Sequence, residues 1–451
     1  MEKEIVVKIE KLASNSQGIA RYEGAVIFVD DVCPEDKCRV EIVKKHKSYY
    51  IAKIKEIIKP SPYRVKPFCP MHKVCGACQL QHIDYKEQLV IKRQIVEDVM
   101  RGLDVDVQEV EPSPQIKEFR HKMQYPIRQT SVSKRMLAGY FKPKSHDLVN
   151  IKYCPIQPKI CDEIIEFIRE NASKYGVDGY NEKTHKGLLR HVVIRSSVLE
   201  GTQLVVLVVN AEKETKDLRT FAEVLFENFE SVVGVSLNFN TKKTNLIMSE
   251  DTKSVIGKEF IKEKLCDTVF KIGANTFFQV NPESANNIFN YVKNYISDNF
   301  KEPVLLDAYA GISAFGLCLS KVAKTVVTVE ENLESVKLAK VLKKENGIEN
   351  IFIYNSDCSE FFEKELEEHK NGYDVTILDP PRKGCSQESL DYALKLTKSK
   401  IVYVSCNPAT LSRDLKYLKE QGARILSLKP FDMFCHTTHI ETVAIIDVEN
   451  I

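Results

Sequence analysis

The stretch IVYVSCNP, residues 401–408, decides the fold of the C-terminal part of this chain. Apolar and β-branched residues run into Cys406 and then into an Asn-Pro stop, which predicts a buried parallel strand that ends in a thiol. Three upstream runs of the same kind end in carboxylates, at Asp307, Glu330 and Asp379. Ligands bind at the carboxyl ends of strands in open α/β sheets, so we expect one rim to carry these four groups.

With 451 residues, the chain is too long for one ordinary domain, and we expect three. Residues 1–58 show short alternating strands between Gly and Pro turns, which predicts a five-stranded OB-type β-barrel, a fold that commonly binds RNA. Residues 59–270 have a mixed pattern and predict a central α+β domain. Residues 271–451 alternate strand and helix, which predicts a doubly wound, Rossmann-like sheet. Part of segment 86–119, which opens with a helix, is expected to pack against this last domain.

Composition and charge bound the possible functions. With 43% hydrophobic and 28% charged residues, the chain is typical of a globular protein. No apolar run reaches membrane-spanning length and no secretory signal opens the chain, so we expect a cytoplasmic protein. The net charge is only +2, yet ten Lys or Arg stand against two acidic residues between Lys117 and Lys159. Such a stretch is either a solvated face or an RNA-binding surface, and its interleaved aromatic residues favour RNA. These aromatic residues are Tyr125, Tyr140, Phe141 and Tyr153.

Cysteines cluster in CPMHKVCGAC, residues 69–78, which holds Cys69, Cys75 and Cys78. Thirteen cysteines without an export signal favour metal binding or catalysis over disulfides. Cys154 is the candidate fourth ligand, because it and Cys69 both precede a proline. This spacing leaves two possibilities open, a zinc site with four thiolates and an iron–sulfur cluster.

Three motifs in one order resemble the RNA (uracil-5-)-methyltransferases, which use S-adenosylmethionine to methylate C5 of uridine in ribosomal or transfer RNA. They are DPPRKG at 379–384, SCNPATLSRD at 405–414 and HTTHIE at 436–441. The pattern SQGIAR at 16–21 likewise resembles the TRAM domain, an RNA-binding barrel.

The resemblance implies a role for each candidate site residue. Cys406 would be the nucleophile that adds to uracil C6, and Glu441 the general base that removes the C5 proton. We expect the strand end and the following helix N-terminus to favour the thiolate of Cys406. The residues implied to bind S-adenosylmethionine are Gln279, Tyr309, Glu330, Asp357 and Asp379.

The resemblance also implies a metal group and a substrate. Cys69, Cys75, Cys78 and Cys154 would hold a [4Fe-4S] cluster, as in the ribosomal-RNA branch of the family. Transfer-RNA members typically lack the barrel and the cluster, so 23S ribosomal RNA is the expected substrate and transfer RNA the alternative. No obligate protein partner is expected.

Two positions depart from the family pattern. Ser313 stands where glycine is frequent, and Cys435 stands where proline is usual and adds a second thiol near the site. Three rival protein classes compete with this interpretation. An amino methyltransferase would have an aromatic residue in place of Arg382, and a cytosine-5 methyltransferase has its nucleophile in a Pro-Cys context. The third is a non-catalytic iron–sulfur RNA-binding protein. The number of residues between the loop that begins at Asp307 and Glu330 also fits an NAD enzyme. However, the chain has no G-x-G-x-x-G motif.

Overall fold

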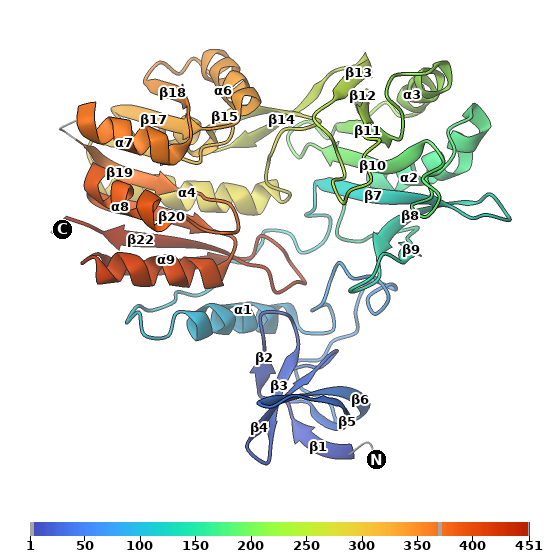
Figure 1. Ribbon diagram of the computed structural model, residues 1–451, viewed down its shortest axis with the longest axis horizontal. Helices are drawn as coiled ribbons and strands as arrows, with labels where there is room; N and C mark the ends of the chain where they lie inside the picture. Colours follow the sequence, from blue (N-terminus) through green and yellow to red (C-terminus); the bar gives the residue numbers. More distant parts are fainter. Residues whose placement is uncertain (1–3, 369–371, 450) are drawn as a thin grey trace.

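The computed structural model describes residues 4–368, 372–449 and 451. In Figure 1 the N-terminal barrel, in blue, lies below two larger units that stand side by side, the central one mostly green and the C-terminal one orange. This arrangement confirms the predicted multi-domain α/β fold. A division at residue 58 falls at the end of the barrel, whereas one at residue 270 would cut a hairpin, so the exact domain limits stay a prediction.

Six strands form the N-terminal sheet, in the spatial order β1-β5-β6-β4-β3-β2, one more than expected. Alternating apolar residues such as Val7, Ile27 and Val40 point into its core. The strands are β1 (Glu4–Lys8), β2 (Lys11–Leu12), β3 (Gly18–Tyr22), β4 (Ala25–Val29), β5 (Lys37–Lys45) and β6 (Tyr49–Lys59).

Helix α1 (Tyr85–Val99) lies between the barrel and the C-terminal unit (Figure 1). Its Ile91 packs into the barrel core, whereas Val96 packs into the core of the C-terminal unit. The hydroxyl of Ser412 donates a hydrogen bond to the carbonyl of Val99 at 2.5 Å. The helix therefore joins two units that are distant in sequence.

The central unit is a seven-stranded sheet in the order β13-β12-β11-β10-β7-β8-β9. The strands are β7 (Lys122–Gln129), β8 (Met136–Phe141), β9 (Leu148–Asn150), β10 (Leu189–Ser196), β11 (Gln203–Val209), β12 (Val232–Phe239) and β13 (Thr252–Gly257). The helices are α2 (Lys159–Asn171), η1 (Ala172–Tyr175) and α3 (Lys216–Asn228). The hairpin of β14 (Phe260–Leu265) and β15 (Thr268–Gly273) leads to the last unit.

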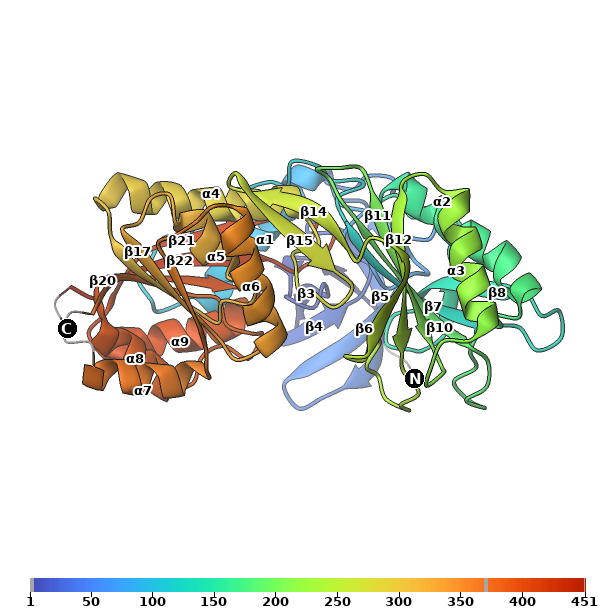
Figure 2. The same ribbon diagram turned by 90° about the horizontal axis from the view of Figure 1, so that it is seen from above.

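The C-terminal unit is a seven-stranded sheet in the order β18-β17-β16-β19-β20-β22-β21, in which β22 runs antiparallel to both neighbours. Its inner strands are rich in Val, Ile and Leu because helices cover both faces. Figure 2 shows α4, α5 and α6 on one face and α7, α8 and α9 on the other. The strands are β16 (Val304–Ala308), β17 (Thr325–Glu330), β18 (Ile351–Asn355), β19 (Tyr373–Leu378), β20 (Thr397–Ser405), β21 (Arg424–Phe431) and β22 (Glu441–Asp447). The helices are α4 (Pro282–Asn299), α5 (Ala314–Leu319), α6 (Leu333–Glu345), α7 (Cys358–Glu368), α8 (Gln387–Leu396) and α9 (Pro408–Glu420).

Among the described residues, no helix combines the length and the apolar character needed to cross a membrane.

Candidate active site

The carboxyl ends of four neighbouring strands form the rim that the sequence predicts. In the order β17-β16-β19-β20, the strands bring Glu330, Asp307, Asp379 and Cys406 to one edge of the sheet. Burial raises the pKa of Asp307, and the charges of Asp379 and Glu330 on the neighbouring strand ends raise it further.

The pairing of β20 with β22 places Cys406 opposite Glu441. The two strands are antiparallel, and Ser405 pairs with Thr442. Continuing this register by one residue sets Cys406, just past β20, against Glu441, the first residue of β22. Directly opposite residues of an antiparallel pair have Cβ atoms about 5 Å apart. The predicted nucleophile and base therefore meet at the edge of the sheet.

Glu441 is a buried carboxyl group with a raised pKa. Its side chain is only 5% exposed. Its pKa is raised to about 8, because the effect of burial, together with the charge of Asp379, outweighs the opposite effect of the Arg382 charge. A base with a pKa near the working pH is well matched to proton removal.

The thiol of Cys406 does not have the lowered pKa that the sequence suggested. The side chain is half-buried, and burial and the charge of Glu441 raise its pKa against the effect of Arg382. The N-terminus of α9 is capped by Asn407, whose side-chain oxygen accepts a hydrogen bond from the N–H of Ala409 at 3.1 Å. Burial and Glu441 therefore oppose the expected thiolate form, and the contribution of the helix N-terminus stays a prediction.

The loop after β16 has a strained backbone that ties it to β17. Tyr309, Gly311 and Ser313 have φ values of 60°, 55° and 57°, all in the left-handed region. The N–H of Gly311 donates to Glu330 Oε2 at 2.8 Å. The left-handed φ explains why glycine is frequent at position 313. Ser313 is held there by a 2.9 Å hydrogen bond between its hydroxyl and that of Thr328.

The other predicted cofactor-binding residues lie around this edge. Asp379 follows β19, and burial raises its pKa to about 7. Asp357 is exposed beyond the end of β18 and caps α7, since its Oδ1 accepts a hydrogen bond from the N–H of Ser359 at 2.8 Å. Gln279 is half-buried just before Asn281, whose amide donates to a carbonyl in the loop that leads to Glu441.

Asp307 belongs to this edge, although the sequence pattern assigned it no role. Its Oδ2 accepts a hydrogen bond from the N–H of Gly316 at 2.8 Å, whereas its buried Oδ1 has no partner among the described residues. Burial raises its pKa to about 8. A buried carboxyl oxygen without a donor at a ligand-binding edge is an available acceptor. In the sequence, its position at the end of the first strand was the only sign that Asp307 belongs to the site.

The four predicted metal-binding cysteines line one recess. Cys69, Cys75 and Cys78 come from the loop before α1, and Cys154 from the turn before α2. The other lining residues are Met71, His72, Ala77, Gln81, Ile151, Tyr153, Pro155 and Ile156. In the part of the chain that the structure describes, no three or more His, Cys, Asp or Glu side chains are arranged to hold a metal ion. Four thiols in a mostly apolar recess are nevertheless the donor set that soft metals and iron–sulfur clusters require.

The side chain of Cys435 belongs to an apolar core cluster that includes Cys154 of the cysteine recess. Its side chain is completely buried, and its S–H donates to the carbonyl of Gln115 at 3.6 Å. It packs in the same apolar cluster as Cys154 and Phe119. The expected second thiol beside the active site is therefore part of the core near the cysteine recess.

The basic stretch is only partly available to RNA. Tyr125 is buried in the core, where its hydroxyl accepts a hydrogen bond from the Gln157 amide at 2.7 Å, so its assignment to an RNA surface is wrong. Arg128 forms an ion pair with Glu182. Four of the exposed cations lie near the turns on either side of β8, where Lys142 pairs with Asp147 at 3.6 Å, and Tyr153 is also exposed. These cations are Lys134, Arg135, Lys142 and Lys144.

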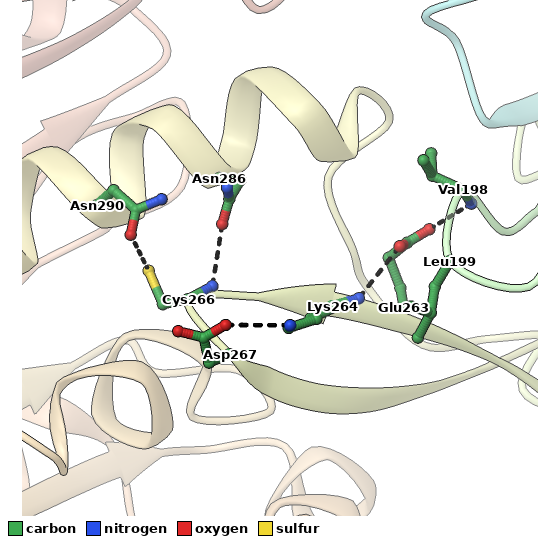
Figure 3. Close-up of a pocket in the computed structure, with 8 residues that line it drawn as sticks. All are labelled: Val198, Leu199, Glu263, Lys264, Cys266, Asp267, Asn286 and Asn290. Atoms are coloured by element: carbon green, nitrogen blue, oxygen red, sulfur yellow. Dashed lines mark hydrogen bonds and ion pairs between the residues drawn. The ribbon is translucent and has the colours of Figure 1, made fainter.

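A separate recess lies where the turn after β10 meets β14 and α4 (Figure 3). Its polar groups are paired with one another. The thiol of Cys266 donates to Asn290 at 3.2 Å, and Lys264 forms an ion pair with Asp267 at 3.0 Å. None of the predicted site residues lines this recess.

Comparison with known proteins identifies the family. The family model described as tRNA (Uracil-5-)-methyltransferase matches residues 84–448, and that of the TRAM domain matches residues 3–55. The chain belongs to the tRNA (uracil-5-)-methyltransferase family. It is an S-adenosylmethionine-dependent, class I RNA (uracil-5-)-methyltransferase with an N-terminal TRAM domain. This assignment sets aside the amino and cytosine-5 methyltransferases as alternatives.

Relatives resemble the chain over almost its whole length. An "uncharacterized RNA methyltransferase" of Clostridium tetani is 37% identical over 98% of both chains. One of Halalkalibacterium halodurans is 34% identical over 99% of this chain and 97% of its own. Among solved structures, the Pyrococcus abyssi tRNA (uracil-54, C5)-methyltransferase, in complex with S-adenosyl-L-homocysteine, is 28% identical with a TM-score of 0.78. That match covers 98% of this chain and 100% of the other.

Proposed function

We propose that this enzyme methylates C5 of a specific uridine in cytoplasmic 23S ribosomal RNA through a covalent adduct with Cys406. The observation that carries the mechanism is the register of β20 and β22, which sets Cys406 against Glu441 beside Asp379. A nucleophile and a buried base at one edge are the two groups that the reaction needs.

Cys406 and Glu441 have complementary tasks. Uracil C5 is too weak a nucleophile to attack a sulfonium methyl unaided. The sulfur of Cys406 adds to C6, which forms a C–S bond and makes C5 enolate-like, and C5 then takes the methyl group of S-adenosylmethionine. Glu441 removes the proton from C5, the C5–C6 double bond re-forms, and the C–S bond breaks to release the thiolate.

The raised pKa of Cys406 sets a condition for the first step. Glu441 and Asp379 raise this pKa through their negative charges. A sulfonium cation bound next to Asp379 offsets that charge, so the thiol ionises more readily once the methyl donor is present. We therefore expect the methyl donor to bind before the adduct forms.

We propose that Gln279, Tyr309, Glu330, Asp357 and Asp379 contact S-adenosylmethionine. Glu330 ends the second strand, the position from which an acidic residue reaches ribose hydroxyls. Its two oxygens each accept one backbone N–H, from Gly311 at 2.8 Å and Asn332 at 2.9 Å. A carboxylate oxygen accepts two hydrogen bonds, so both retain a free lone pair. Asp357 lies one strand further along and would stand near the adenine.

We further propose that Cys69, Cys75, Cys78 and Cys154 hold one [4Fe-4S] cluster. The support is that all four line one mostly apolar recess, with the zinc site as the alternative. A cluster there would tie the loop before α1 to the start of α2. Its role in this proposal is structural.

Iron analysis tests the cluster. Protein purified without oxygen should be brown and hold about four irons per chain. Cys154→Ala should abolish the colour, whereas Cys161→Ala, which removes a buried thiol of α2 outside the recess, should keep it. Colourless protein with one zinc per chain would replace the cluster by the zinc alternative and keep the four ligands.

The architecture does not separate the two candidate RNAs. The solved transfer-RNA enzyme matches 98% of this chain, so its match extends into the barrel that the sequence took as a mark of ribosomal-RNA enzymes. The four cysteines, by their resemblance to the ribosomal-RNA branch, support 23S ribosomal RNA. The two substrates can be distinguished by mapping 5-methyluridine in ribosomal and transfer RNA from cells that lack the gene. Loss from transfer RNA alone would contradict the proposed substrate.

A covalent trap tests the mechanism. RNA that carries 5-fluorouridine at the target should form an adduct that survives denaturation, because fluorine cannot leave as a proton does. Cys406→Ala should abolish the adduct, whereas Cys435→Ala, which removes the buried neighbouring thiol, should keep it. Glu441→Gln should trap natural RNA instead. If Cys406→Ala still forms the adduct, the nucleophile is misassigned, and an absence of S-adenosylmethionine binding would favour the non-catalytic RNA-binding alternative.

A further inference from the structure

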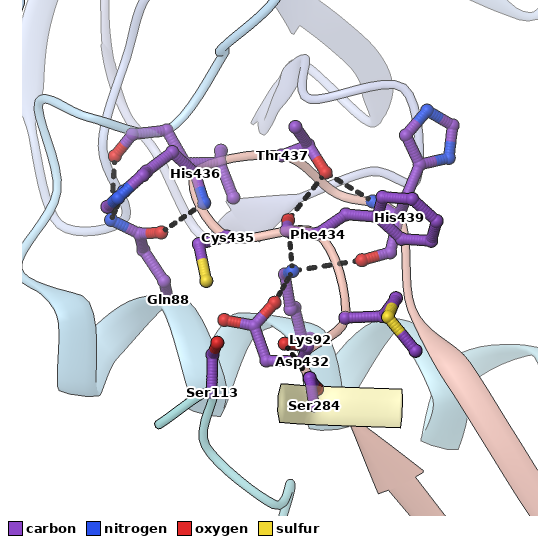
Figure 4. A network of polar contacts seen from close by, with 12 residues as sticks. Gln88, Lys92, Ser113, Ser284, Asp432, Phe434, Cys435, His436, Thr437 and His439 are labelled. Carbon is purple, nitrogen blue, oxygen red and sulfur yellow. Dashed lines mark hydrogen bonds and ion pairs between the residues drawn. The ribbon is translucent and has the colours of Figure 1, made fainter. Parts of the chain in front are cut away.

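The loop that carries Glu441 is held by parts of the chain far from it in sequence. This loop, residues 432–440, connects β21 to β22 and has no helix or strand of its own. We call it the base loop. Figure 4 shows that the polar contacts of the base loop converge on a few buried side chains, several of them from α1. A loop without regular structure depends on such contacts for its shape.

Lys92 of α1 is the centre of this network. Both Lys92 and Asp432 have completely buried side chains. The ammonium group donates to Asp432 Oδ1 at 2.5 Å, to the carbonyl of Phe434 at 3.0 Å and to the carbonyl of His439 at 2.9 Å. All three donors of the ammonium are therefore used on the base loop. These three hydrogen bonds connect the beginning of the base loop to its end, where His439 lies two residues before Glu441.

Asp432 extends the network to two other elements. Its Oδ2 accepts a hydrogen bond from the Tyr85 hydroxyl at 2.8 Å, and that hydroxyl accepts one from the N–H of Ser113 at 2.9 Å. The backbone carbonyl of Asp432 accepts a hydrogen bond from the Ser284 hydroxyl of α4 at 3.2 Å. The start of the base loop is thus fixed on two sides.

His436 fixes the middle of the base loop. Its backbone is left-handed, with φ 63°, and its side chain is buried. The ring Nε2 donates to the carbonyl of Ile116 at 2.7 Å, so Nδ1 is the acceptor for the Gln88 amide at 3.3 Å. The Gln88 oxygen in turn accepts the backbone N–H of His436 at 3.2 Å.

His436 also joins the base loop to the loop that supplies Cys69, Cys75 and Cys78. The carbonyl of His436 accepts hydrogen bonds from the N–H groups of Gln79 and Leu80, both at 2.8 Å. The ring of Phe68, which directly precedes Cys69, meets the His436 ring edge-on with centroids 5.0 Å apart. The loop that supplies three cysteines therefore forms one wall of the base-loop support.

We infer that Lys92 and His436 are positioning residues for Glu441 and act on the elimination step. A buried ion pair is weak support for stability, because desolvation of the charges offsets their attraction. Two of the three bonds of Lys92 go to backbone carbonyls, so what they determine is the path of the loop. None of the hydrogen bonds described above involves Cys406, which follows β20, whereas Glu441 begins β22 directly after the base loop. This inference rests on the proposed covalent mechanism.

The inference separates two steps of the reaction. Addition of Cys406 to C6 should continue when the base loop is loosened, whereas proton removal by Glu441 should slow. Misplacement of a catalytic group by about 1 Å can cost up to about a hundredfold in rate. Variants of the network should therefore accumulate the covalent adduct on natural RNA, as is also expected for Glu441→Gln.

The decisive variant removes both buried charges, Lys92→Met with Asp432→Asn. Its matched control is Lys400→Met with Asp447→Asn, which removes a similar pair, 2.9 Å apart, at the other end of β20 and β22. Gel analysis of denatured reactions measures the fraction of natural RNA held as adduct. A parallel reaction with 5-fluorouridine RNA measures addition. We expect at least about a tenfold rise of adduct in the first pair only, with addition nearly unchanged.

His436→Ala is the second test and decides if the double variant does not fold. It should also accumulate adduct, and His436→Gln, which keeps a side-chain amide, should accumulate less. The inference is overturned if Glu441→Gln accumulates adduct while the network variants do not, or if the control pair gives the same rise. If Glu441→Gln itself accumulates none, the proposed mechanism fails and the inference fails with it.

Discussion

Release of methylated RNA from the Cys406 adduct is predicted to become faster as the pH rises. In the proposed mechanism, release requires the ionised carboxylate of Glu441, whose pKa is raised to about 8, chiefly by burial. About a tenth of this group is ionised at pH 7 and about nine-tenths at pH 9, since each pH unit changes the ratio of the two forms tenfold. The release rate should therefore rise about tenfold between pH 7 and pH 9.

Substitution of Arg382 tests whether the ionisation of Glu441 causes this pH dependence. Its positive charge lowers the pKa of Glu441, so Arg382→Gln should move the midpoint of the profile to higher pH. Lys383→Gln removes a charge from the next exposed residue, which is not among the groups that shift Glu441. The control should therefore leave the midpoint in place.

A pH-jump experiment measures this step alone. The adduct is formed on natural RNA in a single turnover at pH 6, the pH is raised, and samples are denatured over time to separate adduct from free methylated RNA. A release rate that stays flat from pH 6 to 9 would refute the argument from Glu441. So would a midpoint that falls in Arg382→Gln, or one that rises equally in Lys383→Gln.

Three further predictions concern the methyl donor, the loop after β16 and the RNA surface. S-adenosylmethionine should bind more tightly as the pH rises from 6 to 9, because Asp379 and Asp307, with pKa values of about 7 and about 8, become anions near its sulfonium. Calorimetry should show a weaker trend for uncharged S-adenosylhomocysteine, and equal slopes would contradict this. Ser313→Gly should change the melting temperature by less than about 4 °C, since relief of the left-handed backbone offsets the lost hydroxyl bond, each about 1 kcal/mol. Ser313→Val should lower it clearly in thermal unfolding, and equal melting temperatures would argue against backbone strain. Charge reversal of the exposed cations should weaken RNA binding and flatten its salt dependence, with S-adenosylmethionine affinity unchanged, in titrations at several salt concentrations. The reversed residues are Lys134, Arg135, Lys142 and Lys144, and an unchanged salt slope would place the RNA surface elsewhere.

The rim of the active site could be predicted from the sequence because buried parallel strands leave a strong local pattern. Runs of Val, Ile and Leu that end in Asp379 or Cys406 need no knowledge of distant residues. The meeting of Cys406 with Glu441 is different. It depends on an antiparallel strand, β22, whose place next to β20 no local pattern indicates, and the family motifs alone supplied Glu441.

The ionisation and burial of individual polar groups could not be predicted from the sequence either, because both depend on contacts with residues distant in the chain. The pKa of Cys406 depends on Glu441, which approaches only through the sheet register. Lys92 lies in an amphipathic helix, where a lysine is expected on the solvent side. It is completely buried against Asp432, which lies 340 positions later in the chain. The local sequence of α1 therefore gives no sign of this partner. Tyr125 was assigned to an RNA surface from its basic neighbours, yet it points into the core of the central sheet.

The division of the catalytic pair between two kinds of support explains why α1 belongs to the methyltransferase unit. Cys406 directly follows β20, and Glu441 begins β22, so the sheet holds both strands next to each other. Glu441 follows a loop whose shape depends on Lys92, Gln88 and Tyr85, all of α1. The match to the family model starts at residue 84, directly before this helix, although the Rossmann-like sheet starts at β16. In the proposed mechanism, the N-terminal half of the chain therefore contributes to the chemistry through α1, whose side chains hold the loop that precedes the proposed base, Glu441.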